Sequence, residues 1–438
     1  DGDGEFGEDA DQDIIKCGSY TGNQNSDGPE INLGFEPQWI MIKGVDSATS
    51  WVMVDVMRGI VTGDLDSLLF ANGSNAELTG SYDLLEVTPT GFKMRGSVSG
   101  TWNNNNEEFI YIAIRRGPMK TPEDATEVFA PEYGLNASAG GQAWSAGFPV
   151  DMYIRKNPAG GTNYIASRMT GNGPYMGTDS TAAENSIPYS EKLDNMDGVF
   201  TTTAYNYTTW ISWMFRRAPG FFDVVAYDGN GVNNRQITHN LGVVPELIII
   251  KRREDTGNWI TYIGPASSSG DVKYMLLNAS SALVSDNTGE FSSLFYDTLP
   301  TSSVFTVGNA STVNRASTGT YIAYLFATLP GISKVGSYTG NGTSTGDSQV
   351  IDCGFSAGAR FVLIKRTDLD KDWWVMDTER GIVAGNDALL RLNLTAAELS
   401  GDIINPNSSG FEVEWRYGPT DGANINAYGA SYIFLAIA

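Results

Sequence analysis

Apolar residues alternate with small or polar residues in four short segments of the chain, and this alternation predicts four β-strands. The segments are residues 109–115, 209–215, 320–326 and 431–437. A second kind of apolar segment carries a basic residue near its end, at residues 38–43, 151–155, 246–252 and 360–366. Gly- and Asn-rich turns separate these segments, and no long amphipathic helical pattern lies between them. The pattern predicts an all-β protein of antiparallel β-sandwiches with little helix.

The sequence repeats itself. Residues 18–23 (Gly-Ser-Tyr-Thr-Gly-Asn) return about 320 residues later at 336–341, and the segment 51–61 has a counterpart at 374–383. Two weaker copies lie between them, which indicates four stacked copies of one domain. The predicted domains are residues 14–117, 128–218, 219–328 and 329–438, with the second the most divergent, an acidic linker at 1–13 and another linker at 118–127.

Proline and glycine mark the joints between the predicted domains, at Gly117-Pro118, Pro219-Gly220 and Pro330-Gly331. Proline fixes φ and lacks an N–H donor, so each joint ends a strand and forms a short, stiff link. Stiff links between tandem domains favour a rod.

Charge and hydropathy exclude some partners. The 438 residues carry a formal net charge of −23 without a basic run, which argues against nucleic acid because phosphate binding needs clustered Lys and Arg. No apolar run approaches the 18 or so residues of a membrane-spanning helix, so no membrane insertion is expected. Asp1 and Asp3 open an acidic segment that resembles a fragment of a Ca²⁺ motif. The rest of that loop is missing, so a solvated linker is favoured and no cofactor is expected.

Catalytic chemistry has little support. The chain has one histidine, His239, in a predicted strand end and turn, which argues against Ser-His-Asp and Cys-His machinery and against histidine-rich metal sites. Cys17 and Cys353 occupy different positions of the repeat, so free, buried thiols are expected. A pair of carboxylates could still hydrolyse a glycan, but none of the 51 acidic residues stands out by its context. We therefore predict no enzyme activity, no catalytic residues and no metal.

Two Asp/Arg pairs are candidate ligand-binding groups. Asp55 and Arg58 recur as Asp377 and Arg380, each before a Gly. An arginine fork beside a carboxylate can clamp a sugar hydroxyl or carboxylate. The alternative is an ion pair within the domain that fixes the turn, and this alternative is favoured because the third copy lacks the pair.

An Asn-rich loop in the first copy is the second candidate. Trp102, Asn103 and Asn104 lie in it, and we expect an exposed tryptophan among amides to bind a ligand at the surface. The recurrent tryptophans Trp51 and Trp374, together with Trp259, head apolar strands, which favours packing over sugar stacking.

The repeat resembles a known family. The order Gly-Ser-Tyr-Thr-Gly-Asn, Leu-Gly-Phe-x-Pro-x-Trp-Ile-x-Ile-Lys, Asp-x-x-Arg-Gly, Ala-Glu, Gly-Phe and Tyr-Ile-Ala is similar to the concanavalin-like or jelly-roll repeats of bacteriophage tail-fibre and related virion proteins, especially those of marine phages including cyanophages. The first and fourth copies match fully, and the third and second match in part.

The resemblance implies a non-enzymatic structural protein of the virion, most simply a tail fibre or other projecting fibre that contributes to attachment to a host glycan or outer-membrane protein. It also implies a homo-oligomer, expected to be a trimer, and contacts with other virion proteins. The alternatives are a capsid- or tail-decorating protein without a receptor role and a polysaccharide-degrading tailspike.

Overall fold

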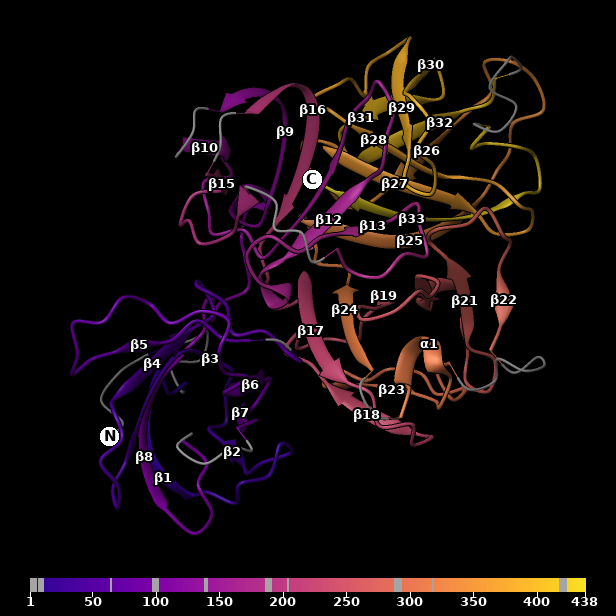
Figure 1. The fold of residues 1–438 in the computed structure, drawn as a ribbon. Helices are drawn as coiled ribbons and strands as arrows, with labels where there is room; N and C mark the ends of the chain where they lie inside the picture. The colour runs from indigo at the N-terminus through magenta and orange to yellow at the C-terminus, as the bar shows by residue number, and fades with distance from the viewer. Residues whose placement is uncertain are drawn as a thin grey trace.

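A computed structural model of the chain describes residues 6, 12–63, 65–96, 102–137, 141–185, 191–202, 205–286, 294–316, 319–416 and 424–438. Antiparallel β-sheets supply almost all the regular structure of these residues (Figure 1). Their helices are α1 (Ser311–Asn314) and the 3₁₀ turns η1 (Ala125–Glu127), η2 (Arg168–Thr170) and η3 (Gly264–Ala266). The predicted all-β class and the scarcity of helix are confirmed.

The sheets fall into four consecutive stretches of chain, which we call the first to fourth units (residues 14–117, 128–218, 219–328 and 329–438). The first unit holds β1 (Ile15–Thr21), β2 (Glu30–Asn32), β3 (Pro37–Gly44), β4 (Val52–Asp55), β5 (Leu69–Phe70), β6 (Leu85–Thr88), β7 (Gly91–Met94) and β8 (Glu108–Arg115). The second holds β9 (Phe129–Ala137), β10 (Gly141–Trp144), β11 (Met152–Lys156), β12 (Tyr164–Ser167), β13 (Met176–Gly177), β14 (Glu191–Lys192), β15 (Val199–Thr201) and β16 (Tyr205–Phe215).

The third and fourth units follow the same plan. The third holds β17 (Phe222–Asp228), β18 (Arg235–Thr238), β19 (Leu247–Arg252), β20 (Ile260–Ile263), β21 (Lys273–Leu276), β22 (Val284–Ser285), β23 (Val304–Val307) and β24 (Thr320–Phe326). The fourth holds β25 (Ser333–Thr339), β26 (Ser348–Asp352), β27 (Phe361–Arg366), β28 (Trp373–Asp377), β29 (Asp387–Arg391), β30 (Leu399–Gly401), β31 (Ile404–Asn407), β32 (Gly410–Glu414) and β33 (Ser431–Ile437). The four segments predicted from alternation lie in β8, β16, β24 and β33, as expected.

Each unit pairs one large sheet with one small sheet. The large sheets begin with the orders β1-β8-β3-β4, β9-β16-β11-β12, β17-β24-β19-β20 and β25-β33-β27-β28. The register is shared as well, because a lysine opposes an isoleucine at one position of all four: Lys43 and Ile110, Lys156 and Ile211, Lys251 and Ile322, Lys365 and Ile433. We call residues that share such a position counterparts. The division into four domains stays a prediction, and this grouping supports it.

Besides the core between the two sheets of each unit, the protein has a core between units. The large sheets of the second, third and fourth units bury their outer faces against one another. The ring centroid of Phe361 lies 5.5 Å from that of Phe129 and 6.2 Å from that of Phe215, which in turn lies 5.8 Å from that of Phe326. A cavity of about 20 Å³ at the centre is lined by apolar side chains of all three units.

Recurring side chains close these three units into a ring. Asn163 Nδ2 donates to the carbonyl oxygen of Leu392 (2.6 Å), Trp259 Nε1 to that of Gly177 (2.9 Å) and Trp373 Nε1 to that of Leu276 (2.9 Å). Lys156 Nζ donates to the carbonyl oxygen of Leu394 (2.7 Å), Lys251 Nζ to that of Thr181 (3.1 Å) and Lys365 Nζ to that of Ser280 (3.0 Å). In both sets the second unit donates to the fourth, the fourth to the third and the third to the second.

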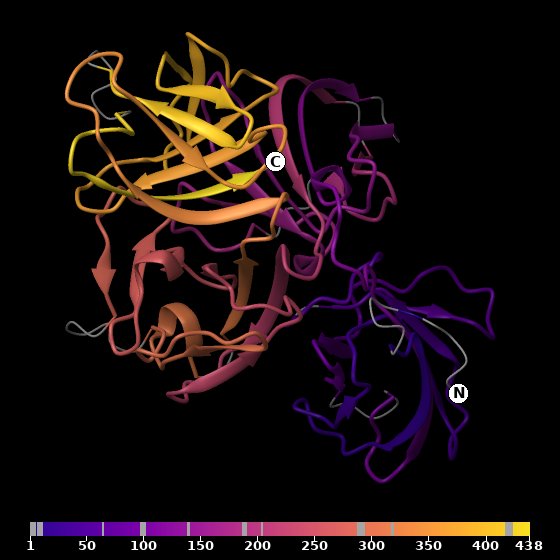
Figure 2. The ribbon, with the colours of Figure 1, turned by 180° about the vertical axis from the view of Figure 1, so that it is seen from behind.

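The rod expected from the stiff joints is therefore wrong for these three units. Their outer sheet faces are apolar, and burying them against one another removes more apolar surface from water than an extended row would. The first unit lies beside the ring, with its small sheet (β2, β6 and β7) towards β17 and its large sheet on the far side (Figures 1 and 2).

The ring lysines give a testable pH dependence. Lys156, Lys251 and Lys365 are fully buried, and burial lowers the pKa of each to about 8. Unfolded lysine titrates near 10.4, so from about pH 8 to about pH 10 the unfolded state binds more protons than the folded state. The contribution of these lysines to the free energy of unfolding should therefore rise with pH over this window and fall as the pH drops through about 8.

Urea unfolding of wild type and Lys251→Met at several pH values measures this effect. We expect the difference in unfolding free energy between the two proteins to change in favour of wild type as the pH rises. Lys43→Met is the matched control, because Lys43 is the half-buried counterpart in the first unit. Parallel pH profiles for wild type and Lys251→Met would contradict the assignment.

Candidate functional site

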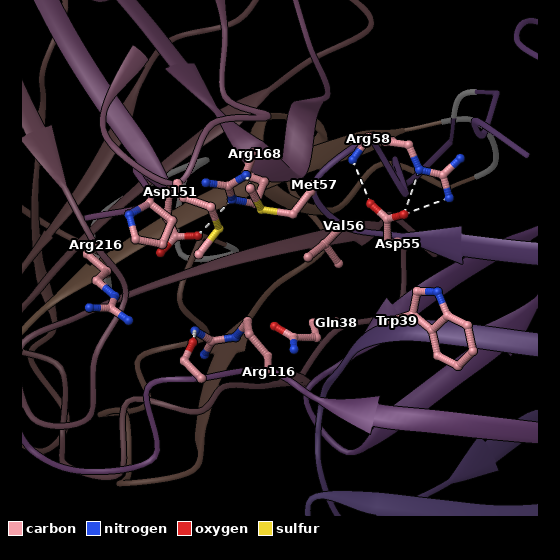
Figure 3. Close-up of a pocket in the computed structure, with 13 residues that line it drawn as sticks. Gln38, Trp39, Asp55, Val56, Met57, Arg58, Arg116, Asp151, Arg168 and Arg216 are labelled. Atoms are coloured by element: carbon pink, nitrogen blue, oxygen red, sulfur yellow. Dashed lines mark hydrogen bonds and ion pairs between the residues drawn. The ribbon is translucent and has the colours of Figure 1, made fainter. Parts of the chain in front are cut away.

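A cavity of about 520 Å³ lies between the first and second units (Figure 3). β3, the end of β4 and the turn after it line one side, and residues next to β11, β12 and β16 line the other. Charged side chains dominate the polar lining: Arg58, Arg116, Arg168 and Arg216, with Asp55 and Asp151. Four guanidinium groups and two carboxylates thus line this hollow in a protein of net charge −23.

Arg58 and Arg168 are each held by an aspartate within their own unit. Arg58 Nε donates to Asp55 Oδ2 (2.6 Å), and its Nη1 donates to Glu77 Oε1 (3.0 Å). Arg168 is buried and donates through Nε to Asp151 Oδ1 (3.1 Å), while its two Nη atoms donate to backbone carbonyl oxygens. These groups shape the cavity wall, and few of their donors remain for a ligand.

Arg116 belongs to a buried cluster that joins the first unit to the ring. Arg217 donates from both Nη atoms to the Glu36 carboxylate (2.7 and 2.8 Å) and from Nε to Asp223 Oδ1 (2.7 Å). Arg116 Nε lies 3.2 Å from Glu36 Oε1. Burial alone would raise the pKa of Glu36, but the charges of Arg217 and Arg116 outweigh it and lower this pKa to about 2. The cluster therefore stays charged over the physiological range and holds the units together.

Arg216 is the exception in the cavity. Within the described part of the chain, the guanidinium of Arg216 makes no hydrogen bond or ion pair. Burial lowers the pKa of Arg216, and the charge of Asp151 opposes this shift in part. Figure 3 shows Arg216 on one side of the hollow and the Asp55–Arg58 pair on the other. A partly buried guanidinium with free donors suits a planar anion such as a carboxylate.

The structure does not bring the two predicted Asp/Arg pairs together. Asp55 and Arg58 lie at the cavity edge with side chains 18% and 23% exposed. Asp377 and Arg380 lie in the fourth unit and are 0% and 3% exposed. Asp377 Oδ2 accepts from Arg380 Nε (2.9 Å) and also from Trp213 Nε1 of the second unit (3.1 Å). The buried pair is therefore part of the ring contact, whereas the exposed pair faces the cavity.

The expected exposure of Trp102 in the Asn-rich loop is wrong. Trp102 is 5% exposed, donates from Nε1 to the Ser50 carbonyl oxygen (2.9 Å) and stacks on Phe70. Asn103 is fully buried, and its Oδ1 accepts the backbone N–H of Asn23 (3.0 Å). Asn104 is half-buried and donates to Glu107 Oε2 (3.1 Å).

The role of Asn103 recurs in two other units. Asn314 accepts the N–H of Asn230 (2.8 Å) and Asn426 that of Asn341 (2.9 Å). These asparagines bind the end of the repeated Gly-Asn turn, so they belong to the framework. The recurrence of Gly-Asn at positions 22–23, 229–230 and 340–341 was the available signal in the sequence.

Sequence analysis also missed a second set of framework asparagines. Asn72, Asn278 and Asn393 accept the backbone N–H groups of Trp51 (2.9 Å), Trp259 (2.8 Å) and Trp373 (3.0 Å). The counterpart of Trp259 is therefore Trp373, and the alignment of Trp374 with it is wrong by one residue. Trp259, Trp373 and Trp374 are buried, in line with packing, whereas Trp51 is half-buried.

The remaining chemical candidates lie apart from the cavity. His239 is 4% exposed, with Nε2 3.2 Å from the Thr301 carbonyl oxygen, and burial lowers its pKa. Cys17 and Cys353 are both free, as expected, although Cys17 is exposed. Asp1 and Asp3 lie outside the described residues; within those residues no cluster of three or more His, Cys, Asp or Glu side chains is placed to hold a metal ion. None of the described helices has the length and apolarity to span a membrane.

Paired antiparallel sheets define the chain as an all-β protein, and one ladder position recurs in its four units. Residues 12–118 and 202–438 match a family model described as "Domain of unknown function (DUF7483)", and the chain belongs to this family. The unmatched stretch contains most of the divergent second unit. No curated protein matches the chain.

Proposed function

We propose that the chain is a non-enzymatic structural component of a phage particle, most simply part of a tail fibre or other projecting fibre that helps attach the particle to its host. The observation that carries the proposal is that the side chains shared by the units make structural hydrogen bonds. The tryptophans, lysines and asparagines shared by the units bind backbone within and between units, so the repeat serves mechanical architecture. The resemblance to virion repeats points the same way.

Antibody labelling of purified particles tests the assignment to the virion. The antibody is raised against the isolated chain, and we expect electron micrographs to show label on a projecting part of the particle. Binding of the fluorescent chain to host cells tests attachment. Labelled particles without cell binding would favour the decorating protein, and unlabelled particles would reject the structural proposal. A reducing-sugar assay on host envelope polysaccharide is expected to show no release, and release would favour the tailspike.

The cavity supports recognition of a carboxylate-bearing host sugar. Arg216 offers guanidinium donors, and Asp55 and Gln38 across the cavity can accept from or donate to hydroxyl groups. We expect short oligosaccharides of uronic acids to bind, neutral oligosaccharides of equal length to bind less, and added salt to weaken binding.

Isothermal titration of Arg216→Ala with a uronic acid oligosaccharide checks this role. One charge-assisted hydrogen bond contributes on the order of 1.5–3 kcal/mol, so we expect the affinity to fall at least about tenfold. Arg315→Ala is the matched control, because Arg315 is an exposed arginine of the third unit that lies outside the cavity lining. Equal affinities for wild type and Arg216→Ala would remove the cavity from the proposal.

A further inference from the structure

The large sheet of the first unit has an apolar face on which none of the described elements packs. Trp39 and Met41 on β3, Met53 on β4, and Ile110, Ile112 and Ile114 on β8 form what we call the open face. All six side chains are partly exposed; Ile110, for example, is 39% exposed. None belongs to the clusters of buried apolar side chains or packs against them among the described residues. Figures 1 and 2 show this sheet on the side of the molecule away from the ring.

The same face is buried in the three other units. The counterparts of Ile110 are Ile211, Ile322 and Ile433, which are 0%, 0% and 4% exposed. The counterparts of Met41 are Ile154, Ile249 and Leu363, which line the small cavity at the centre of the ring. The chain thus contains three covered copies of this surface and one copy outside the buried clusters of the described residues.

The polar groups that close the ring are also present in the first unit. Lys43 is the counterpart of the ring lysines, and Trp51 is the counterpart of Trp259 and Trp373. Lys43 Nζ donates to the carbonyl oxygens of its own Gly44 (2.5 Å) and Ser47 (3.2 Å), whereas each ring lysine reaches the neighbouring unit.

The acceptor side is present as well. The Phe70 carbonyl oxygen occupies the ladder position of Leu276, which accepts from Trp373 in the ring. Both carbonyl oxygens also accept an N–H from the residue three positions later: Gly73 (3.2 Å) and Ala279 (3.4 Å). The first unit therefore carries the donors and the acceptor turn of a ring contact, and among the described residues their hydrogen bonds stay within the first unit.

We propose that three copies of this chain associate through their open faces, in a second ring with the geometry of the internal one. A surface that donates on one edge and accepts on the other makes a heterologous contact, and the internal ring shows that this contact closes after three units. Lys43 and Trp51 of each copy then donate to the turn around Phe70 of the next. Trp39 also lines the cavity, so the cavity borders this interface. The inference goes beyond the proposed function and does not depend on it.

The molar mass in solution tests the proposal. Light scattering during gel filtration is expected to give three times the 47.2 kDa of one chain. Because each chain carries a net charge of −23, higher salt should favour the trimer at low protein concentration. A wild-type mass of one or two chains at every concentration and salt level would overturn the proposal.

Ile110→Lys locates the interface. A lysine at this position of the open face should give a mass of one chain with an unchanged far-ultraviolet spectrum. Val350→Lys is the matched control, because Val350 is a 48% exposed aliphatic residue on β26, far along the chain from the open face, and this variant should remain a trimer. A trimeric Ile110→Lys protein would reject this face.

Two further measurements test whether the open face is covered by the N-terminal segment of the chain, or whether the trimer forms through another surface. If only a variant without residues 1–11 forms trimers, the N-terminal segment of the chain covers the face and the proposal fails for the full chain. In a Cys17→Ser background, Met41→Cys should be linked into two-chain products by a short bis-maleimide, whereas Val350→Cys should not. Absence of linked Met41→Cys chains in a trimeric sample would assign the trimer to another surface.

Discussion

Phe361→Ala is expected to lower the free energy of unfolding by about 3–5 kcal/mol, the usual range for truncating a buried aromatic residue. Phe361 is 2% exposed on β27, and its ring lies within 6.2 Å of the rings of Phe129, Trp213 and Phe215. Alanine would enlarge the existing central cavity and remove the contacts of this ring with three aromatic rings of the second unit. Urea unfolding followed by circular dichroism measures the loss.

Trp39→Ala is the matched control for Phe361→Ala. Trp39 is the counterpart of Phe361, since the two oppose Ile114 and Ile437 at the same ladder position, but Trp39 lies on the open face of the first unit. The comparison is made in the Ile110→Lys background, so that self-association does not contribute. Trp39→Ala should then cost less than about 1 kcal/mol, because little buried volume is lost. Equal losses for the two substitutions would argue against a shared core in the ring.

The fold class followed from local sequence because a strand with one solvent face alternates with period two and turns collect Gly, Pro and Asn. The sequence also contains a signal of the ring, but the pattern of apolar residues alone does not show which units pack together. β11, β19 and β27 read as nearly continuous apolar runs and are buried on both faces. β3 has the same kind of sequence but alternates between buried and partly exposed residues. Sequence therefore indicates which faces need a partner, whereas the identity of the partner depends on contacts between residues far apart in the chain.

The candidate site was less accessible to sequence analysis. The spacing of Asp55 and Arg58 predicted their ion pair, but their place at a cavity edge depends on Asp151 and Arg216 of another unit. Nothing in the local sequence places Trp102 in a core, because its partners, Phe70 and Ser50, are 32 or more residues away in the chain. Recurrence in the aligned units was the better guide to framework residues than local polarity.

Asp377→Ala should lower the free energy of unfolding by about 3 kcal/mol or more, whereas Asp55→Ala should lower it by about 1 kcal/mol or less. Both aspartates accept hydrogen bonds from the side chain and from the backbone N–H of the arginine three residues later. The difference is burial: without Asp377, the 3% exposed Arg380 keeps Glu398 as its carboxylate partner, and Trp213 Nε1 loses its acceptor. Without Asp55, Arg58 turns to water and to Glu77.

The same two variants separate the two interpretations of the Asp/Arg pairs. If Asp55 serves the cavity, Asp55→Ala should weaken binding of the uronic acid oligosaccharide with little change in unfolding free energy, and Asp377→Ala should do the reverse at a temperature where it stays folded. If both pairs are structural, oligosaccharide affinity will be the same in both variants as in wild type. A large loss of stability in Asp55→Ala would mean that the first unit depends on its exposed pair as strongly as the fourth depends on its buried one. Counterpart residues would then have equal roles inside and outside the ring, and burial would not be what distinguishes them.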